Sequence, residues 1–88
     1  MVNVLVADDE VPIRQWLEFC INKMEGYHVV GSASNGAEGY SIFRKTNPDV
    51  IITDIRMPVM DGLEMLKMIR NLNPAVYAAV LTSHEDFE

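Results

Sequence analysis

Apolar residues along the chain gather in four short runs with the lengths and compositions of β-strands. The runs lie at positions 3–7, 27–33, 50–53 and 76–81. The third run, Val50-Ile51-Ile52-Thr53, is continuous and β-branched throughout. Uninterrupted runs of this kind are typical of strands buried on both faces of a parallel sheet. The pattern therefore predicts a sheet of parallel strands.

The segment after the first run has the spacing of a one-sided helix of about four turns. Pro12 suits the first turn of this helix, and Gly26 suits its end. Apolar residues recur at helical offsets, and the spacing predicts that all of them face the core: Ile13, Trp16, Leu17, Cys20, Ile21 and Met24.

Two more helices are predicted, over residues 37–45 and 63–72. Gly39 lies inside the first of them and should weaken it by about 1 kcal/mol relative to alanine. Asp61 precedes the second and is interpreted as its N-terminal cap. The residues of this helix expected to face the core are Leu63, Leu66 and Ile69.

Strands and helices alternate along the chain. This order predicts an α/β fold, with a parallel sheet, right-handed crossovers and helices on both faces. Residues 83–88 resemble the opening of a further helix, with Ser83 as its cap. The 88 residues allow one domain, 1–88, without a repeat or a linker.

Acidic and hydroxyl side chains follow three of the predicted strands. Asp8 and Asp9 follow the first, Asp54 the third, and Thr82 and Ser83 the fourth. Because the carboxyl ends of parallel strands form the binding edge of such sheets, we expect these residues in one pocket. Clustered carboxylates either raise a pKa or hold a cation, and oxygen ligands favour Mg²⁺ or Mn²⁺. A carboxylate beside such a metal can attack a phosphoryl group and form an acyl phosphate.

Composition narrows the function classes. The net charge of −6 argues against nucleic-acid binding by this segment, since a phosphate backbone needs a basic face. A single cysteine, Cys20, excludes an internal disulfide and favours a reducing compartment. Without a signal peptide or an apolar stretch near ~20 residues, a cytoplasmic location and no membrane are expected. Trp16 and Cys20 are interpreted as core residues and Glu10 as solvated helix surface.

Three segments resemble the signature segments of response regulator receiver domains. They are Ala7-Asp8-Asp9-Glu10, the stretch 53–62 with its Asp, Met-Pro and Asp-Gly, and Leu81-Thr82-Ser83. The middle segment is highly specific, and the likeness extends over essentially all of the chain. The ending Asp86-Phe87-Glu88 is similar to receivers joined to helix-turn-helix DNA-binding domains of the arabinose-regulator type.

The resemblance implies a flavodoxin-like, doubly wound sheet of order 2-1-3-4 and a two-component signalling role. It implies that Asp54 accepts a phosphoryl group from a sensor histidine kinase and that Thr82 hydrogen-bonds that group. Mg²⁺ (or Mn²⁺) would be held by Asp9, Asp54 and the Arg56 backbone carbonyl, with Asp8 bound directly or through water. The output, a DNA-binding domain, lies outside this chain, so the segment is expected to be a switch and not an enzyme.

Receivers have a fifth strand, a last helix and a lysine that pairs with the phosphoryl group, for which these 88 residues hold no counterpart. We therefore expect an incomplete domain that phosphorylates poorly or forms a homodimer by strand exchange through the bare strand 76–81. One alternative is a phosphorylation-incompetent interaction or dimerisation module. Another is a phosphohydrolase of the haloacid-dehalogenase type, which needs a second Asp where this chain has Arg56.

Overall fold

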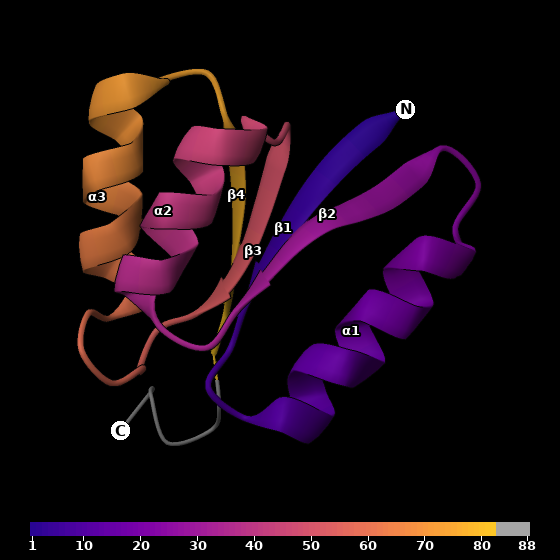
Figure 1. Cartoon of the computed structure of the whole chain (residues 1–88), viewed down its shortest axis with the longest axis horizontal. Helices are drawn as coiled ribbons and strands as arrows, with labels where there is room; N and C mark the ends of the chain where they lie inside the picture. The colour runs from indigo at the N-terminus through magenta and orange to yellow at the C-terminus, as the bar shows by residue number, and fades with distance from the viewer. Residues whose placement is uncertain (83–88) are drawn as a thin grey trace.

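A computed structural model describes residues 1–82 and shows a three-layer arrangement (Figure 1). The elements in chain order are β1 (Val2–Ala7), α1 (Val11–Lys23), β2 (Tyr27–Ala33), α2 (Gly36–Thr46), β3 (Val50–Asp54), α3 (Gly62–Leu72) and β4 (Tyr77–Leu81). The four strands form one parallel sheet in the order β2-β1-β3-β4. Helices α2 and α3 cover one face of the sheet, and α1 covers the other (Figure 1).

The predicted flavodoxin-like, doubly wound sheet is confirmed, including its order 2-1-3-4. The helix opening predicted at Ser83 lies outside the described residues. Within residues 1–82, no helix has the length and apolar character needed to cross a membrane.

The face beneath α2 and α3 carries the larger core. Its buried members are Leu5, Ala7, Ala33, Phe43, Ile51, Met65, Ile69 and Val76. Burial of such side chains stabilises a fold by roughly 1.5–3 kcal/mol each for the larger ones. Gly39 has a role here, because a Cβ at this position would lie 2.5 Å from the Met65 sulfur. Glycine at position 39 weakens helix α2, but its lack of a side chain lets α2 and α3 approach each other closely.

The face beneath α1 has a smaller core, formed by Val4, Val6 and Ile21 with Leu17 half-buried against them. The prediction that the whole apolar stripe of α1 faces the core is wrong for Ile13, Trp16 and Met24, which are 39%, 63% and 50% exposed. Cys20 is half-buried.

The orientation of α1 explains this difference. Glu18 accepts a hydrogen bond from the Ser32 hydroxyl of β2 at 3.1 Å, so this flank of the helix faces the β2 edge. Trp16 lies two residues away, about 200° around the helix, and therefore on the opposite flank. The apolar stripe is wider than the strip of helix that meets the sheet.

Helix α3 begins as predicted but is rotated relative to the expectation. Asp61 caps it, since its Oδ1 accepts a hydrogen bond from the Glu64 backbone N–H at 2.8 Å. Met65 and Ile69 are fully buried, whereas Leu63 is 54% exposed, so the inward orientation predicted for Leu63 is wrong. Leu63 precedes Met65 by two residues, which places it about 200° away from the buried stripe.

The register of the sheet positions the site. Ala7 of β1 pairs with Thr53 of β3, and Asp54 of β3 pairs with Leu81 of β4. The residues that follow these strands therefore emerge at one edge. Strand β4 is the outer strand beside β3, as predicted, and Tyr77 at its start is 76% exposed.

Candidate functional site

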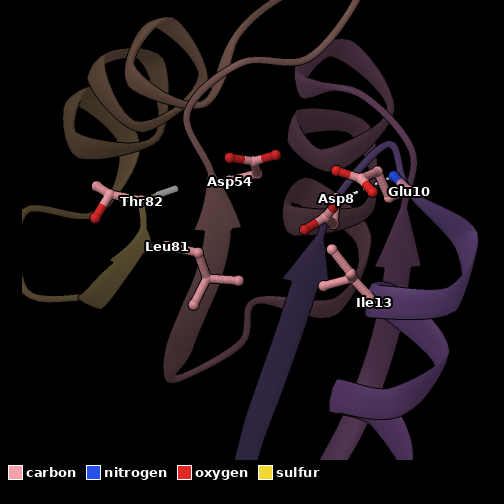
Figure 2. Close-up of a pocket in the computed structure, with 6 residues that line it drawn as sticks. All are labelled: Asp8, Glu10, Ile13, Asp54, Leu81 and Thr82. Atoms are coloured by element: carbon pink, nitrogen blue, oxygen red, sulfur yellow. Dashed lines mark hydrogen bonds between the residues drawn. The ribbon is translucent and has the colours of Figure 1, made fainter. Parts of the chain in front are cut away.

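A pocket opens at the carboxyl edge of the sheet (Figure 2). It is lined by Asp8, Glu10, Ile13, Asp54, Leu81 and Thr82. These residues come from the ends of β1, β3 and β4 and from the start of α1. The structure thus brings together Asp8, Asp54 and Thr82, three residues that the sequence placed at separate strand ends.

Asp8 is held by several hydrogen bonds and is only 2% exposed. Its backbone N–H donates to the Ala33 carbonyl at 3.0 Å. Its side-chain Oδ1 accepts from the Glu10 backbone N–H at 2.8 Å, and its carbonyl oxygen accepts from Arg14 Nη1 at 2.8 Å. The carboxylate therefore has a set orientation at the end of β1.

Burial raises the pKa of the Asp8 carboxyl, and the nearby charges of Asp9 and Glu10 raise it further. The hydrogen bond from the Glu10 N–H and the positive charge of Arg14 act in the opposite direction. The ionised form of Asp8 is thus less favourable in the fold than in an exposed aspartate. A bound cation would stabilise it.

Asp54 ends β3 and is half-buried. Its Oδ1 accepts from the Ile55 backbone N–H at 2.7 Å, and its carbonyl oxygen accepts from the Thr53 hydroxyl at 2.8 Å. Gly62 packs on that carbonyl so closely that a Cβ would lie 1.9 Å from the oxygen. The glycine of the Asp-Gly pair therefore lets the loop close behind Asp54.

Three adjacent acids, Asp8, Asp9 and Glu10, have carboxylate oxygens that all lie within 4.8 Å of one another. Asp9 and Glu10 are exposed, and Glu10 also lines the pocket, a position that its interpretation as solvated helix surface missed. The signal for Glu10 was its place directly after Asp8 and Asp9, three residues past the end of the buried strand β1. A set of oxygen donors of this kind suits Mg²⁺ or Mn²⁺.

Of the other predicted site residues, Thr82 lines the pocket, whereas Asp9 and Arg56 are not among the residues that line it. Arg56 follows Asp54 by two residues, and its side chain is exposed. Thr82 is also exposed, and Figure 2 shows its side chain turned away from Asp54. Thr82 would have to reorient to hydrogen-bond a group attached to Asp54.

Comparison with known proteins identifies the class. Residues 4–88 match the family model of the response regulator receiver domain. The chain therefore belongs to the receiver domain family of two-component response regulators. This membership decides against the haloacid-dehalogenase-type alternative.

Relatives and solved structures agree with this assignment. The chain is 33% identical over 86 residues to the transcriptional regulatory protein LnrK of Bacillus subtilis. It is 37% identical over 89 residues to the uncharacterized transcriptional regulatory protein YesN of the same organism. The response regulator domain of Thermotoga maritima CheB superposes with a TM-score of 0.89 at 35% identity.

The matches cover nearly all of this chain but only part of the relatives. They take in 98% of the chain and 39% of LnrK, and 100% of the chain and 24% of YesN. For the CheB domain the shares are 94% of this chain and 61% of the solved chain. The activities of the whole relatives therefore belong to proteins much longer than this segment.

Proposed function

We propose that this receiver domain is a phosphoacceptor switch in which Asp54 takes a phosphoryl group from the histidine of a sensor kinase. The observation that carries the proposal is the convergence of Asp8, Glu10, Asp54 and Thr82 in one pocket of a receiver fold. Asp54 attacks phosphorus, the phosphorus–nitrogen bond breaks, and the imidazole keeps the electron pair. The product is an acyl phosphate on Asp54.

The donor set fits Mg²⁺ or Mn²⁺, because carboxylate oxygens cluster beside Asp54 and the burial of Asp8 disfavours its uncompensated charge. Asp8, Asp9, Asp54 and the Arg56 carbonyl are the proposed ligands, and Glu10 is near enough to join them. The ion would supply charge compensation for the phosphoryl oxygens. The protein's own part is to hold these acids in place and keep Asp54 accessible.

The backbone supports the role of Asp54. The Ile55 N–H bonded to Oδ1 holds the carboxylate at the mouth of the pocket. Thr82, at the end of β4, carries a hydroxyl that can donate to a phosphoryl oxygen once its side chain turns toward Asp54. Such a movement would transmit phosphorylation to β4 and the residues beyond it.

The proposed output is a DNA-binding domain outside these residues, since LnrK is named as a transcriptional regulatory protein. The proposed partner on the input side is a histidine kinase. The segment itself acts as a signalling domain and not as an enzyme with an external substrate. The assignment of residues 1–88 to one receiver domain, incomplete at its C-terminal end, stays a prediction, as do the arabinose-regulator subtype and the cytoplasmic location.

A direct test is to incubate the chain with Mg²⁺ and acetyl phosphate, a small acyl-phosphate donor, and to measure its intact mass. We expect a gain of one phosphoryl group in the wild type. Asp54→Asn and a chelator should each abolish the gain. Asp61→Asn is the matched control, because it removes an acid from the same loop while its amide oxygen can still cap α3.

A gain that persists in Asp54→Asn would place the acceptor elsewhere. No gain from a folded chain would favour the second candidate, an interaction or dimerisation module without phosphotransfer. Within residues 1–82, β4 pairs with β3 alone, and an unpaired strand edge of this kind can pair with another chain, which supports that candidate. The molar mass in solution across a dilution series would then show whether a homodimer forms.

A further inference from the structure

We infer that Arg14 is a positioning residue for the acidic site, because it fixes the backbone from which Asp8, Asp9 and Glu10 project. This inference rests on the proposed cation site. It goes beyond that site because Arg14 is not among the proposed ligands. Its role follows from three features of the turn between β1 and α1.

First, Arg14 ties the turn at two points. Its Nη1 donates to the Asp8 carbonyl oxygen at 2.8 Å, and this bond is partly buried. Its backbone N–H donates to the Glu10 carbonyl at 3.0 Å. The second bond is the ordinary backbone bond of the helix, so the contact that depends on arginine at this position is the one from the guanidinium to the Asp8 carbonyl.

Second, helix α1 lacks the side-chain cap that α2 and α3 have. Asn35 caps α2 by accepting from the Glu38 N–H at 2.8 Å, and Asp61 caps α3 in the same way. At the corresponding position of α1, Glu10 makes no side-chain cap hydrogen bond. The guanidinium of Arg14 thus supplies a link between turn and helix that a cap supplies elsewhere.

Third, the hydrogen bond from Arg14 is one of three that hold Asp8 in place. The backbone N–H of Asp8 donates to the Ala33 carbonyl, and its backbone carbonyl accepts from Arg14. One of its carboxylate oxygens accepts from the Glu10 N–H. Without the bond from Arg14, the peptide between Asp8 and Asp9 could rotate. Rotation would displace the neighbouring carboxylates relative to Asp54.

A positioning role and a purely electrostatic role predict opposite results. Arg14 is a cation beside three acids, so removal of its charge alone should strengthen the binding of another cation. If Arg14 positions the ligands, its removal should weaken cation binding instead. Loss of a partner that orients metal ligands typically costs about 10–100-fold in affinity.

The experiment compares Mg²⁺ binding to the full chain by calorimetric titration in the wild type, Arg14→Met, Arg14→Lys and Arg44→Met. Arg44→Met is the matched control, since it removes an exposed helical arginine in the last turn of α2. We expect Arg14→Met to weaken Mg²⁺ binding about 10-fold, despite the loss of a repelling charge. Arg14→Lys keeps a donor and should fall between Arg14→Met and the wild type, whereas Arg44→Met should bind like the wild type.

A second readout does not depend on the metal. The Glu10 N–H donates to Asp8 Oδ1, so its hydrogen exchange should accelerate in Arg14→Met. Exchange at Leu5 and Ile51 in the core strands should stay as slow as in the wild type. Equal acceleration at all these amides would mean global destabilisation and would overturn the positioning role.

The outcomes separate the two proposals. If the wild type binds no Mg²⁺, the proposed cation site fails, and the Glu10 exchange still decides the role of Arg14. If Mg²⁺ binds Arg14→Met as tightly as the wild type or more tightly, the positioning role is overturned and the cation site stands.

Discussion

The two faces of the sheet differ in how completely they are covered (Figure 1). Beneath α2 and α3, the buried core residues are at most 3% exposed. On the other face the buried core has three members, and α1 leaves large apolar side chains in contact with solvent. These are Val11, Ile13, Trp16, Phe19 and Met24.

The strands themselves contribute apolar side chains to both faces, so the contrast arises from the covering layer. Two helices lie on one face and, within residues 1–82, one lies on the other. Val50 and Ile52 face the α1 side and are only half-buried, whereas Ile51 between them is fully buried. The stability of the described fold must therefore reside mainly on the α2 and α3 side.

The candidate site residues Asp8 and Asp54 lie on the less covered side. Asp8 continues the alternation of Val4 and Val6, and Asp54 continues that of Val50 and Ile52. Side chains two apart in a strand share a face, so both carboxylates project on the α1 side. The well-packed face supports the sheet, and the candidate pocket lies on the α1 side, where Ile13 of α1 lines it.

The largest expected effect is the difference in stability loss between a substitution on one face and a substitution on the other. Ile69→Ala empties a fully buried position on α3 and should lower the free energy of unfolding by about 3 kcal/mol. Ile13→Ala, at a 39% exposed position of α1, should cost less than about 1 kcal/mol. Urea unfolding followed by circular dichroism measures both. Similar losses would mean that the α1 face is covered in solution.

Next in size is the effect of adding a methyl group at two glycines. Gly62→Ala would place a Cβ against the Asp54 carbonyl and should cost about 2–3 kcal/mol. Gly26→Ala, in the turn after α1, meets no atom within 4 Å and strains only its φ of +86°, which costs about 1 kcal/mol. Thermal unfolding would rank them. A larger stability loss for Gly26→Ala than for Gly62→Ala would show that the loop behind Asp54 can shift to accommodate the added methyl group.

A third prediction concerns the buried charge on the α1 side. Because the pKa of Asp8 is raised in the fold, the folded state binds this proton more tightly than the unfolded chain does. The free energy of unfolding should therefore fall as the pH rises from the pKa of Asp8 in the unfolded chain, about 3.9, through its raised pKa in the folded protein. Asp8→Asn keeps the Oδ1 acceptor and should be more stable than the wild type at neutral pH without Mg²⁺. The gain should vanish in acid, and a gain independent of pH would contradict this cause.

The smallest expected effect lies in the loop between β3 and α3. Val59 has a φ of 69° although it is β-branched, and it is 85% exposed. Val59→Gly should relieve the strain and raise the free energy of unfolding by up to about 1 kcal/mol. Val59→Ala keeps a Cβ and should gain less, as melting temperatures would show. Equal gains would point to the exposed isopropyl group and not to the backbone.

Much of the fold could be predicted because its signals are local. Continuous β-branched runs mark buried strands, and Asp61 before an apolar helix marks a cap that the structure contains. The meeting of Asp8, Asp54 and Thr82 also followed from the sequence, because parallel strands end at a common edge. Glu10 was missed because an acid at a helix start has the same local pattern whether or not a pocket lies beside it.

The sequence by itself thus determined the order of elements, the parallel sheet and the edge at which the acids gather. Only the tertiary structure decided which apolar residues are covered, since Trp16 and Leu63 have the periodicity of core residues and yet contact solvent. It also decided that Arg14 reaches back to the Asp8 carbonyl. The physical reason is that periodicity depends on the helix alone, whereas burial and side-chain hydrogen bonds depend on what the neighbouring layers present.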